Sequence, residues 1–342
     1  MQKAVALIGV GMVGGSYVNA LAELPDIRLA GALGARSGSA AAFLAKHGLG
    51  GIAYGSVAEI AADRSVDFVI LTTPPNARVE IVETLAAAGK PILMEKPVER
   101  SLAAATGLVD LCEAAGVPLG IMLQHRASEP ARALQKRLQA EDFGPLRVAE
   151  IHVPWWRDQG YYDEPGRGTY ARDGGGVLIT QAIHVLDLAL QFTGPVRDVV
   201  ALTATSGFHT MEAEDFVSAG LRFGNGAIGS LMASTASFPG RSEEIILQFA
   251  HASVSLQRGR LLINWQDGRS EVLGDTEPSG AGADPMAFSA HLHRDMIADF
   301  AECIEAGRPP IASGKSALRV HALIEALERS GRTGTRQQVA ND

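Results

Sequence analysis

The sequence predicts an α/β domain with a doubly wound parallel sheet, followed by an α+β domain with a large, open, mainly antiparallel sheet. Three observations support this prediction. The chain has 342 residues, which is enough for two domains with their own cores. Short apolar runs alternate with helical patterns up to residue 123, as in βαβ units. Beyond that residue, strand-like runs follow one another and helical patterns become few.

In the first domain, apolar runs of strand length alternate with helical patterns. Gly48, Gly89 and Gly116 each follow a helical pattern directly, which is typical of a helix C-cap. The predicted strands are 5–10, 27–33, 66–72, 91–94 and 118–123, and the helices between them end at residues 24, 47, 88 and 115.

In the second domain, Asn225-Gly226 lies between two strand-like runs and predicts a hairpin. The predicted strands are 147–153, 196–205, 216–223, 227–234, 244–250, 253–257 and 260–265. The predicted helices are 178–192, 291–306 and 314–330, and residues 271–290 are expected to form an exposed loop. The predicted domains are thus 1–123 for a cofactor, 124–312 for substrate and oligomerisation, and a helix and tail, 313–342, expected to pack back on the first domain.

Composition excludes several classes of protein. A net charge of −8 and an isoelectric point near 5.6 argue against a nucleic-acid binder. No apolar stretch approaches the roughly 18 residues of a membrane span. The N-terminus resembles a secretory signal only superficially, because glycines interrupt its apolar run, so a cytoplasmic location is expected.

Cysteines and histidines give no metal site. Cys112 and Cys303 are too few for a disulfide framework or a zinc set, and both lie in apolar helical patterns that predict burial. His291 and His293 are two residues apart and face different sides of a helix. We therefore expect no metal.

A glycine-rich turn follows the first predicted strand and begins the first predicted helix. Such a turn places pyrophosphate at a helix N-terminus: the first glycine allows the turn, the second lets the phosphates approach, and the third lets the helix pack on the strand. The motif is Gly9-Val10-Gly11-Met12-Val13-Gly14. It predicts a dinucleotide-binding Rossmann domain.

The end of the second predicted strand bears on the choice of cofactor. An acidic residue there would bind the ribose hydroxyls of NAD, but this chain has Ala35 at that position. Arg36 and Ser37 follow and suit a 2′-phosphate. NADP is favoured over NAD, and the alternative is that Arg36 only stacks on adenine.

Two further segments follow buried strands at the carboxyl edge of the predicted sheet, where open α/β folds bind ligands. They are Thr72-Thr73-Pro74-Pro75-Asn76 and Glu95-Lys96-Pro97. We expect the cofactor to contact Thr72, Thr73, Pro74, Asn76, Glu95 and Lys96.

Together these motifs resemble the Gfo/Idh/MocA family of oxidoreductases, over nearly the whole chain. The resemblance rests on residues 9–14, Thr73-Pro74-Pro75-Asn76, Ala88-Gly89-Lys90-Pro91, Glu95-Lys96-Pro97, Asp173-Gly174-Gly175-Gly176, Gln181-Ala182-Ile183-His184, Asp187, Gly307-Arg308-Pro309-Pro310 and residues 317–330.

The resemblance implies an NAD(P)-dependent dehydrogenase. Hydride would pass between nicotinamide and a secondary alcohol or ketone of a sugar, a sugar derivative or a cyclitol. Lys96 would contact the reacting hydroxyl and the nicotinamide ribose, and His184 would remove or return the hydroxyl proton. Two alternatives stay open: a physiological reductase of a keto-sugar or aldehyde, and a cofactor-binding regulator without turnover.

The chain departs from the family pattern at two positions. Thr180 stands where many relatives have aspartate, four residues before His184, which weakens any mechanism that needs a carboxylate there. Arg78 stands where relatives often have histidine, and we expect it on the surface or against the cofactor pyrophosphate. Asp187 lies on the same helix face as His184, and a structural role is expected for it.

An aromatic and polar segment, 153–162, suits carbohydrate, whose C–H faces stack on rings. From it we expect Trp156, Arg157 and Tyr162 to contact substrate, together with Thr180, His125, Lys96 and His184. The alternative is a domain or oligomer interface. Arg126 is expected to form a structural pair. The open sheet needs a cover, so a homodimer or homotetramer is expected.

Overall fold

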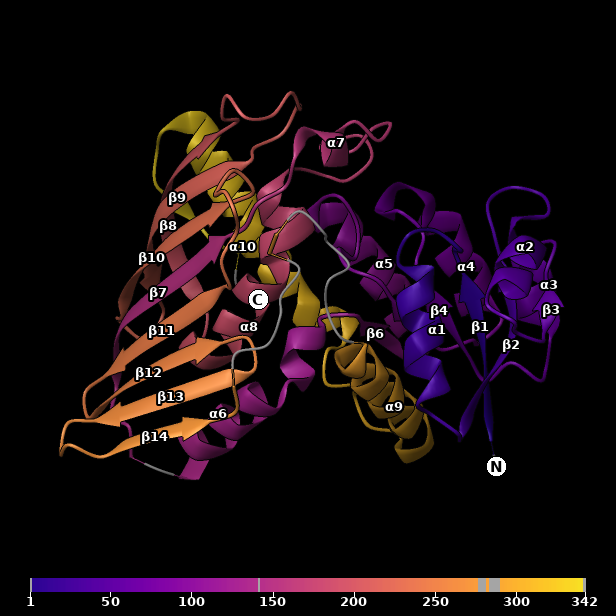
Figure 1. Ribbon diagram of the computed structural model, residues 1–342, viewed down its shortest axis with the longest axis horizontal. Coiled ribbons are helices and arrows are strands. Elements are labelled where there is room, and N and C mark those ends of the chain that lie inside the picture. Colours follow the sequence, from indigo (N-terminus) through magenta and orange to yellow (C-terminus); the bar gives the residue numbers. More distant parts are fainter. Residues whose placement is uncertain (1, 141, 276–280, 283–289, 341–342) are drawn as a thin grey trace. The chain divides into compact units, whose positions relative to one another are not determined.

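The computed structural model describes residues 2–140, 142–275, 281–282 and 290–340. The chain forms two compact units. Unit 1 comprises Met1–Gln124 and Ser289–Ala317, and unit 2 comprises His125–Phe288 and Leu318–Asp342. Each unit has one sheet, and the two sheets confirm the predicted fold class (Figure 1).

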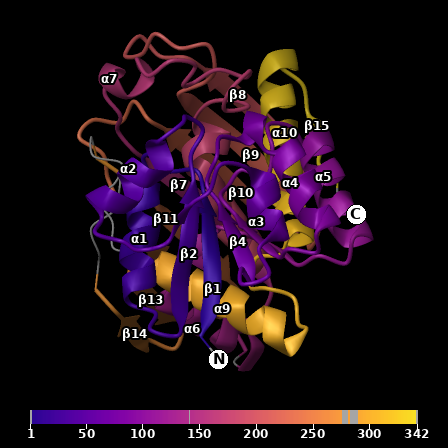
Figure 2. The ribbon, with the colours of Figure 1, turned by 90° about the vertical axis from the view of Figure 1, so that its right-hand side faces the viewer.

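Unit 1 contains a six-stranded parallel sheet in the order β3-β2-β1-β4-β5-β6. The order reverses between β1 and β4, which makes the sheet doubly wound. Figure 2 shows α1 and α2 on one side of the strands and α4 and α5 on the other. The strands are β1 (Lys3–Ile8), β2 (Ile27–Leu33), β3 (Ile52–Ala53), β4 (Phe68–Leu71), β5 (Ile92–Met94) and β6 (Leu119–Ile121), and the helices are α1 (Gly14–Ala22), α2 (Ser39–Lys46), α3 (Val57–Ala62), α4 (Val79–Ala87) and α5 (Leu102–Ala114).

The central strands of unit 1 are buried on both faces, because helices cover both sides of the sheet. All four residues of β4 are buried, and so are the last five residues of β1. The five predicted strands are therefore confirmed. The sequence analysis missed β3, whose two residues are exposed at the sheet edge, and α3. A cap begins α3, because Ser56 Oγ accepts a hydrogen bond from the Glu59 amide (3.2 Å).

Unit 2 contains a nine-stranded sheet in the order β14-β13-β12-β11-β7-β10-β9-β8-β15. Only β7 and β10 pair in parallel; the other described pairs are antiparallel. The predicted hairpin at Asn225-Gly226 joins β9 and β10. The strands are β7 (Leu146–Pro154), β8 (Val196–Ala204), β9 (Phe216–Phe223), β10 (Ile228–Ser234), β11 (Glu244–Phe249), β12 (Ala252–Gln257), β13 (Arg260–Trp265), β14 (Ser270–Leu273) and β15 (Gln337–Gln338).

Helices cover one face of this sheet. A π-helical turn, η3 (Leu178–Ala182), leads into α8 (Ile183–Thr193), which packs against β7 and β11 (Figure 1). The sequence analysis missed α6 (Glu129–Ala140), which contacts α8 and β13, and the short α7 (Gln159–Tyr162). Polar residues dominate α6, so its apolar face is short.

The two C-terminal helices were both predicted, α9 with its observed bounds and α10 three residues too short, but they belong to other units than expected. Helix α9 (His291–Ala306) was expected in the second domain, yet it packs on α1 in unit 1, where Phe300 contacts Phe68. Helix α10 (Gly314–Thr333) and the tail were expected against the first domain. Residues from Leu318 instead belong to unit 2, where β15 pairs with β8.

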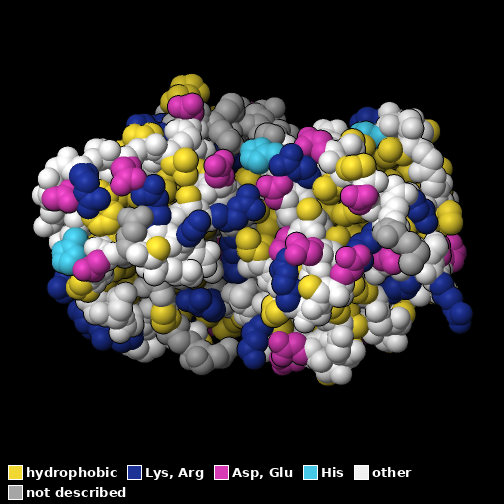
Figure 3. Space-filling model, turned by 90° about the horizontal axis from the view of Figure 1, so that it is seen from below, with side chains coloured by type: hydrophobic (Ala, Val, Ile, Leu, Met, Phe, Trp, Pro, Cys, Tyr) yellow, Lys and Arg dark blue, Asp and Glu magenta, His cyan; other side chains and the backbone are white. Residues whose placement is uncertain are grey.

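The predicted loop 271–290 begins with strand residues of β14. Residues 276–280 and 283–289 of that loop lie outside the described residues. Within the described chain, no helix has the length and hydropathy to cross a membrane. Basic and acidic side chains are mixed on the face that Figure 3 shows.

Candidate active site

The glycine-rich turn of unit 1 lies between β1 and α1. Gly9 has φ +103°, and a Cβ there would lie 2.5 Å from Thr72 Oγ1, so only glycine fits. A Cβ at Gly11 would meet nothing within 4 Å, whereas one at Gly14 would lie 3.0 Å from the Phe43 ring. Open space over the second glycine and close packing at the third are the features of a pyrophosphate cradle.

Two hydroxyls beside this turn also fit a bound dinucleotide. Thr72 Oγ1 donates a hydrogen bond to the Gly9 carbonyl (2.7 Å) and holds the turn. Thr73 Oγ1 is buried and has no hydrogen-bond partner among the described residues. Because buried hydroxyls are normally paired, a ligand is the natural partner for Thr73. These residues would bind the diphosphate and nicotinamide ends of NAD(P).

Other predicted cofactor residues lie at the same carboxyl edge of the sheet. Ala35, Arg36 and Ser37 are exposed and follow β2, the strand beside β1. Met12 is 53% exposed, and Val13 precedes α1. Pro74 and Asn76 are exposed after β4; Glu95 and Lys96 follow β5. Their roles toward a cofactor stay predictions.

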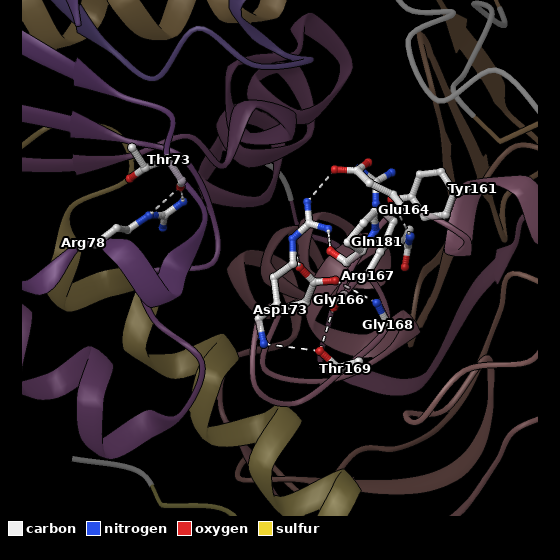
Figure 4. Close-up of polar contacts among 12 residues, drawn as sticks. Thr73, Arg78, Tyr161, Glu164, Gly166, Arg167, Gly168, Thr169, Asp173 and Gln181 are labelled. Carbon is white, nitrogen blue, oxygen red and sulfur yellow. Dashed lines mark hydrogen bonds and ion pairs between the residues drawn. The ribbon is translucent and has the colours of Figure 1, made fainter. Parts of the chain in front are cut away.

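Arg78 is not on the surface, and this corrects the sequence prediction. Its side chain is 1% exposed, and its guanidinium faces backbone carbonyls. Nε and Nη2 donate to the Thr73 carbonyl (3.0 and 2.7 Å; Figure 4), and Nη1 donates to the carbonyl of Glu95 (2.6 Å). The carbonyls of Pro97 and Val98 also face Nη1. Burial arises because β4 and β5 are neighbours, so that the loops after them enclose Arg78.

Tyr17 is a residue near the glycine-rich turn that the sequence analysis did not single out. It lies on α1, fully buried, and its hydroxyl donates to Glu95 Oε1 (2.8 Å). Burial and the neighbouring Glu95 carboxylate raise the pKa of Tyr17 well above its usual value. His293 of α9 contacts the Tyr17 ring edge-on at 5.3 Å. The only sequence signal for Tyr17 was its place three residues after Gly14.

In unit 2, His184 lies in the first turn of α8 and is 7% exposed. The His125 ring stacks on it, with the ring centroids 5.1 Å apart and the planes at 30°. His125 belongs to the 3-10 turn Gln124–Ala127 and is 8% exposed. The structure therefore brings together two of the predicted substrate-site residues.

A buried ion pair connects the two segments that carry these histidines. Arg126 Nε donates to Asp187 Oδ2 (2.7 Å), and Nη2 donates to Asp187 Oδ1 (2.5 Å). The two side chains are 5% and 2% exposed. This contact fits the structural roles expected for Arg126 and Asp187. Arg126 directly follows His125, and Asp187 lies three residues after His184. The Asp187 carboxylate is thus engaged by the guanidinium.

Glu214 anchors the chain that leads into η3 and α8. Its carboxylate accepts hydrogen bonds from the amides of Gly176 (3.1 Å) and Leu178 (3.0 Å), and its carbonyl accepts from Val177 (2.8 Å). Burial raises the pKa of Glu214, although these amides oppose the shift. A Cβ at Gly176 would lie 1.8 Å from the Glu214 carbonyl oxygen, so this position needs glycine.

Thr180 lies inside the π-helical turn, a feature often found at functional sites. Its hydroxyl faces the Gly176 carbonyl (2.6 Å) and the side-chain oxygen of Gln181. Gln181 in turn donates to the Tyr161 hydroxyl (3.3 Å). Thr180 therefore supports the turn locally, and its contact with substrate stays a prediction.

The predicted aromatic site residues differ in accessibility. Arg157 is 3% exposed and donates to the carbonyls of Trp156 (2.7 Å) and Gly282 (2.6 Å). Tyr162 is 7% exposed, with its hydroxyl 2.7 Å from Thr235 Oγ1. Trp156 is half-buried. Of the three, Trp156 is the most exposed, and the contacts of all three with substrate stay predictions.

Ion pairs order the segment before the three glycines, as Figure 4 shows. Glu164 pairs with Arg167 and with Arg172 (2.7 Å), and Asp173 Oδ2 accepts from the Gly168 amide (2.8 Å). The Arg167 guanidinium lies 4.2 Å from the centre of the Tyr161 ring. This segment is thus linked through Tyr161 to the turn that carries Thr180 and Gln181.

Neither cysteine has the accessible, low-pKa environment of a reactive thiol. Both are buried, and burial raises each thiol pKa to about 11. Among the described residues, no group of three or more His, Cys, Asp or Glu side chains is arranged to hold a metal ion.

Comparison with known proteins agrees with this geometry. Residues 3–123 match the oxidoreductase family with an NAD-binding Rossmann fold, and residues 131–261 match the GFO/IDH/MocA C-terminal domain. A D-apiose dehydrogenase of Paraburkholderia graminis is 26% identical over 96% of this chain and 88% of its own length. A 1,5-anhydro-D-fructose reductase of Ensifer adhaerens is 27% identical over 87% of each chain.

Among solved structures, the WlbA dehydrogenase from Bordetella pertussis in complex with NADH and UDP-GlcNAcA superposes with a TM-score of 0.83. It is 26% identical to this chain and the alignment covers 100% of both. The glycine cradle, the two strand-end loops and the paired domain matches agree on one assignment. This chain is an NAD(P)-binding oxidoreductase of the Gfo/Idh/MocA family.

Proposed function

We propose that this chain is an NAD(P)-dependent dehydrogenase that acts on a secondary alcohol of a sugar, a sugar derivative or a cyclitol. The observation that carries the proposal is the buried, fixed imidazole of His184, stacked on His125 and held in place by the Arg126–Asp187 pair. The names of the relatives support the substrate class, since D-apiose and 1,5-anhydro-D-fructose are sugars or sugar derivatives.

In this proposal His184 takes the hydroxyl proton as a neutral imidazole. The Lys96 ammonium donates to the same oxygen, lowers the pKa of the alcohol and stabilises the developing negative charge. Lys96 also binds the nicotinamide ribose. The cofactor, when bound, accepts the hydride. In the reverse direction, the carbonyl carbon would receive the hydride from the reduced cofactor, and His184 would return the proton to the oxygen while Lys96 donates to it, which is the reductase alternative.

We propose NADP as the favoured cofactor and NAD as the alternative. Arg36 and Ser37 are exposed after β2 and suit a 2′-phosphate, and Ala35 supplies no carboxylate for ribose hydroxyls. On the other side, the related WlbA dehydrogenase holds NADH. His125, Trp156, Arg157, Tyr162 and Thr180 are the proposed substrate contacts.

The test is a screen for NAD(P) reduction over monosaccharides, glycosides, anhydrosugars, inositols and uronates. Against the best substrate, His184→Ala and Lys96→Ala should each lower kcat by about 100-fold or more. His251→Ala and Lys46→Ala are matched controls, because both side chains are exposed. Equal activity of His184→Ala and wild type would sink the proposed roles.

One observation favours a second function, a cofactor-binding regulator without turnover. Thr180 stands where a carboxylate would assist His184, and its hydroxyl faces its own turn. If wild type binds NAD(P)H but neither it nor His184→Ala turns over any compound of the panel, the regulator is favoured over the dehydrogenase.

A further inference from the structure

Arg78 is a buried cation held by carbonyl oxygens rather than by a carboxylate. Among the described residues, no carboxylate lies within 4.0 Å of its guanidinium. Burial lowers the pKa of Arg78 to about 10, while Glu95, Tyr17 and Glu99 oppose that shift, so the group stays charged at neutral pH. Burying a cation in this way costs free energy that an apolar side chain of similar volume would not.

The carbonyls that Arg78 binds belong to both strand-end loops. Thr73 supplies the carbonyl after β4, and Glu95 and Pro97 supply the two carbonyls that flank Lys96. A guanidinium is suited to this task, because its planar fork of five N–H donors reaches several acceptors at once. The backbone of Lys96 is therefore held from one residue before it and from one residue after it.

The Glu95 side chain connects the same loop to the glycine-rich turn. Its carboxylate accepts from the Lys96 amide (3.1 Å) and from Tyr17 on α1 (2.8 Å). Thr72 completes the network through the Gly9 carbonyl. Three segments that the cofactor is expected to contact are thus joined by Arg78, Tyr17 and Thr72 inside one unit.

From this arrangement we infer that Arg78 is a positioning residue for Lys96: it fixes the backbone on both sides of that lysine relative to the Thr73 loop. The inference rests on the proposed role of Lys96 and adds the residue that holds it. A displacement of about 1 Å in a catalytic group can cost about 100-fold in rate. Loss of the Arg78 hydrogen bonds is therefore expected to slow the reaction.

The experiment compares Arg78→Gln and Arg78→Lys with Val82→Ala, in the full chain. Val82 is fully buried on α4, one turn after Arg78, and its truncation destabilises the same helix while leaving every hydrogen-bond donor of Arg78 in place. The readouts are hydrogen exchange of the apo chain, Tm, the Kd for NADH and NADPH from fluorescence, and kcat and KM.

Arg78→Gln should speed amide exchange in residues 72–78 and 95–100 by about 10-fold or more, while Val82→Ala leaves those segments near wild type. Arg78→Gln should also lower kcat by about 100-fold, with the KM for substrate changed only a few-fold. Arg78→Lys keeps the charge but not the fork, so kcat should recover in part. If Arg78→Gln does not fold, Arg78→Lys carries the same comparison.

Equal exchange in residues 95–100 for Arg78→Gln and Val82→Ala would overturn the inference, as would a kcat within about 3-fold of wild type. Failure of the proposed function looks different. In that case Lys96→Ala keeps full activity, or wild type has no turnover, while the exchange comparison still decides whether Arg78 holds the Lys96 loop.

Discussion

Two arginines of unit 1 follow parallel strands and yet have opposite environments. Arg36 is exposed after β2, as expected from a polar segment at a strand end. Arg78 was expected on the surface or against the cofactor pyrophosphate but is 1% exposed. The difference is tertiary: β4 lies next to β5, so the loop after β5 closes over Arg78. The sequence around residue 78 gives no sign that the loop after β5 lies next to it.

Arg36 gives the first prediction. Arg36→Ala should lower kcat/KM for NADP by about 10-fold to 100-fold, since a charge-assisted hydrogen bond contributes roughly 1.5–3 kcal/mol. The value for NAD should hardly change, because NAD has no 2′-phosphate. Steady-state kinetics with both cofactors measures this, with Lys46→Ala on α2 as the control. An equal loss for both cofactors would show that Arg36 stacks on adenine instead.

Glu328 of α10 is a largely buried acid next to Gly175, with its side chain 13% exposed. Burial, and next the nearby Glu214 carboxylate, raise the pKa of Glu328 to about 8, from an ordinary value of 4.5. Its Oε1 has no hydrogen-bond partner among the described residues and lies 2.8 Å from where a Cβ of Gly175 would be. The folded chain therefore binds a proton here that the unfolded chain releases.

This difference sets the sign of a pH effect. Between about pH 4.5 and pH 8 the folded state holds more protons at Glu328, so the free energy of unfolding falls as pH rises. Glu328→Gln cannot ionise and should remove on the order of 2–4 kcal/mol of this loss. Urea unfolding at pH 5.5 and pH 8.5 tests it, with the exposed Glu83→Gln as control. Parallel pH curves for Glu328→Gln and wild type would contradict the assignment.

At the scale of elements, the strands were the most predictable part. Apolar runs identified five strands of unit 1 and seven of unit 2, because strands buried between helices or facing a core must be apolar. Three of the missed elements lack that signal. β3 has two exposed residues, β15 has two glutamines, and α6 is mostly polar. Each is defined by a neighbour remote in sequence.

The entry to α8 shows how a motif and its partner are separated along the chain. The three glycines were recognised from the sequence, but their anchor, Glu214, lies before β9 and carried no recognisable pattern. The amides of Gly176 and Leu178 bind its carboxylate, and the whole turn depends on this approach. The backbone at the last of the three glycines is thus held by a buried acid.

Gly176→Ala tests that approach. Its Cβ would lie 1.8 Å from the Glu214 carbonyl oxygen, so the turn must shift and lose the Val177–Glu214 hydrogen bond. We expect a loss of about 2 kcal/mol or more in the free energy of unfolding, and a larger loss in kcat than in stability-matched variants. Gly220→Ala on β9 is the control, because its Cβ meets nothing within 4 Å. Equal stability of the two variants would contradict the close approach.

At the scale of the whole molecule, the face of the nine-stranded sheet opposite α8 carries several exposed apolar side chains among the described residues. Val200, Leu202, Ile228 and Val272 are 47–61% exposed, and the strand registers place them on one face. The opposite face lies under α8. Surfaces of this kind are typical of subunit contacts, which agrees with the expected homodimer or homotetramer.

Light scattering measures this expectation directly. The mass should be two or four times 35.9 kDa, and Leu202→Glu should shift it toward 35.9 kDa, because a carboxylate would be buried without a partner. Ile52→Glu is the control, since Ile52 is 51% exposed but lies in unit 1. A wild-type mass of 35.9 kDa at all concentrations would refute the oligomer.

Local sequence was sufficient for the fold class and the dinucleotide turn, while the candidate pair Lys96 and His184 came from the resemblance to the family. These features depend on short-range rules: period of hydrophobicity, glycine spacing, and motifs a few residues long. Tertiary contacts decided the burial of Arg78 and the anchoring by Glu214. They also decided that α9 belongs to unit 1 and most of α10 to unit 2. Each of these features depends on contacts between segments far apart in the chain. Such contacts are selected by the free energy of burial and not by local propensity.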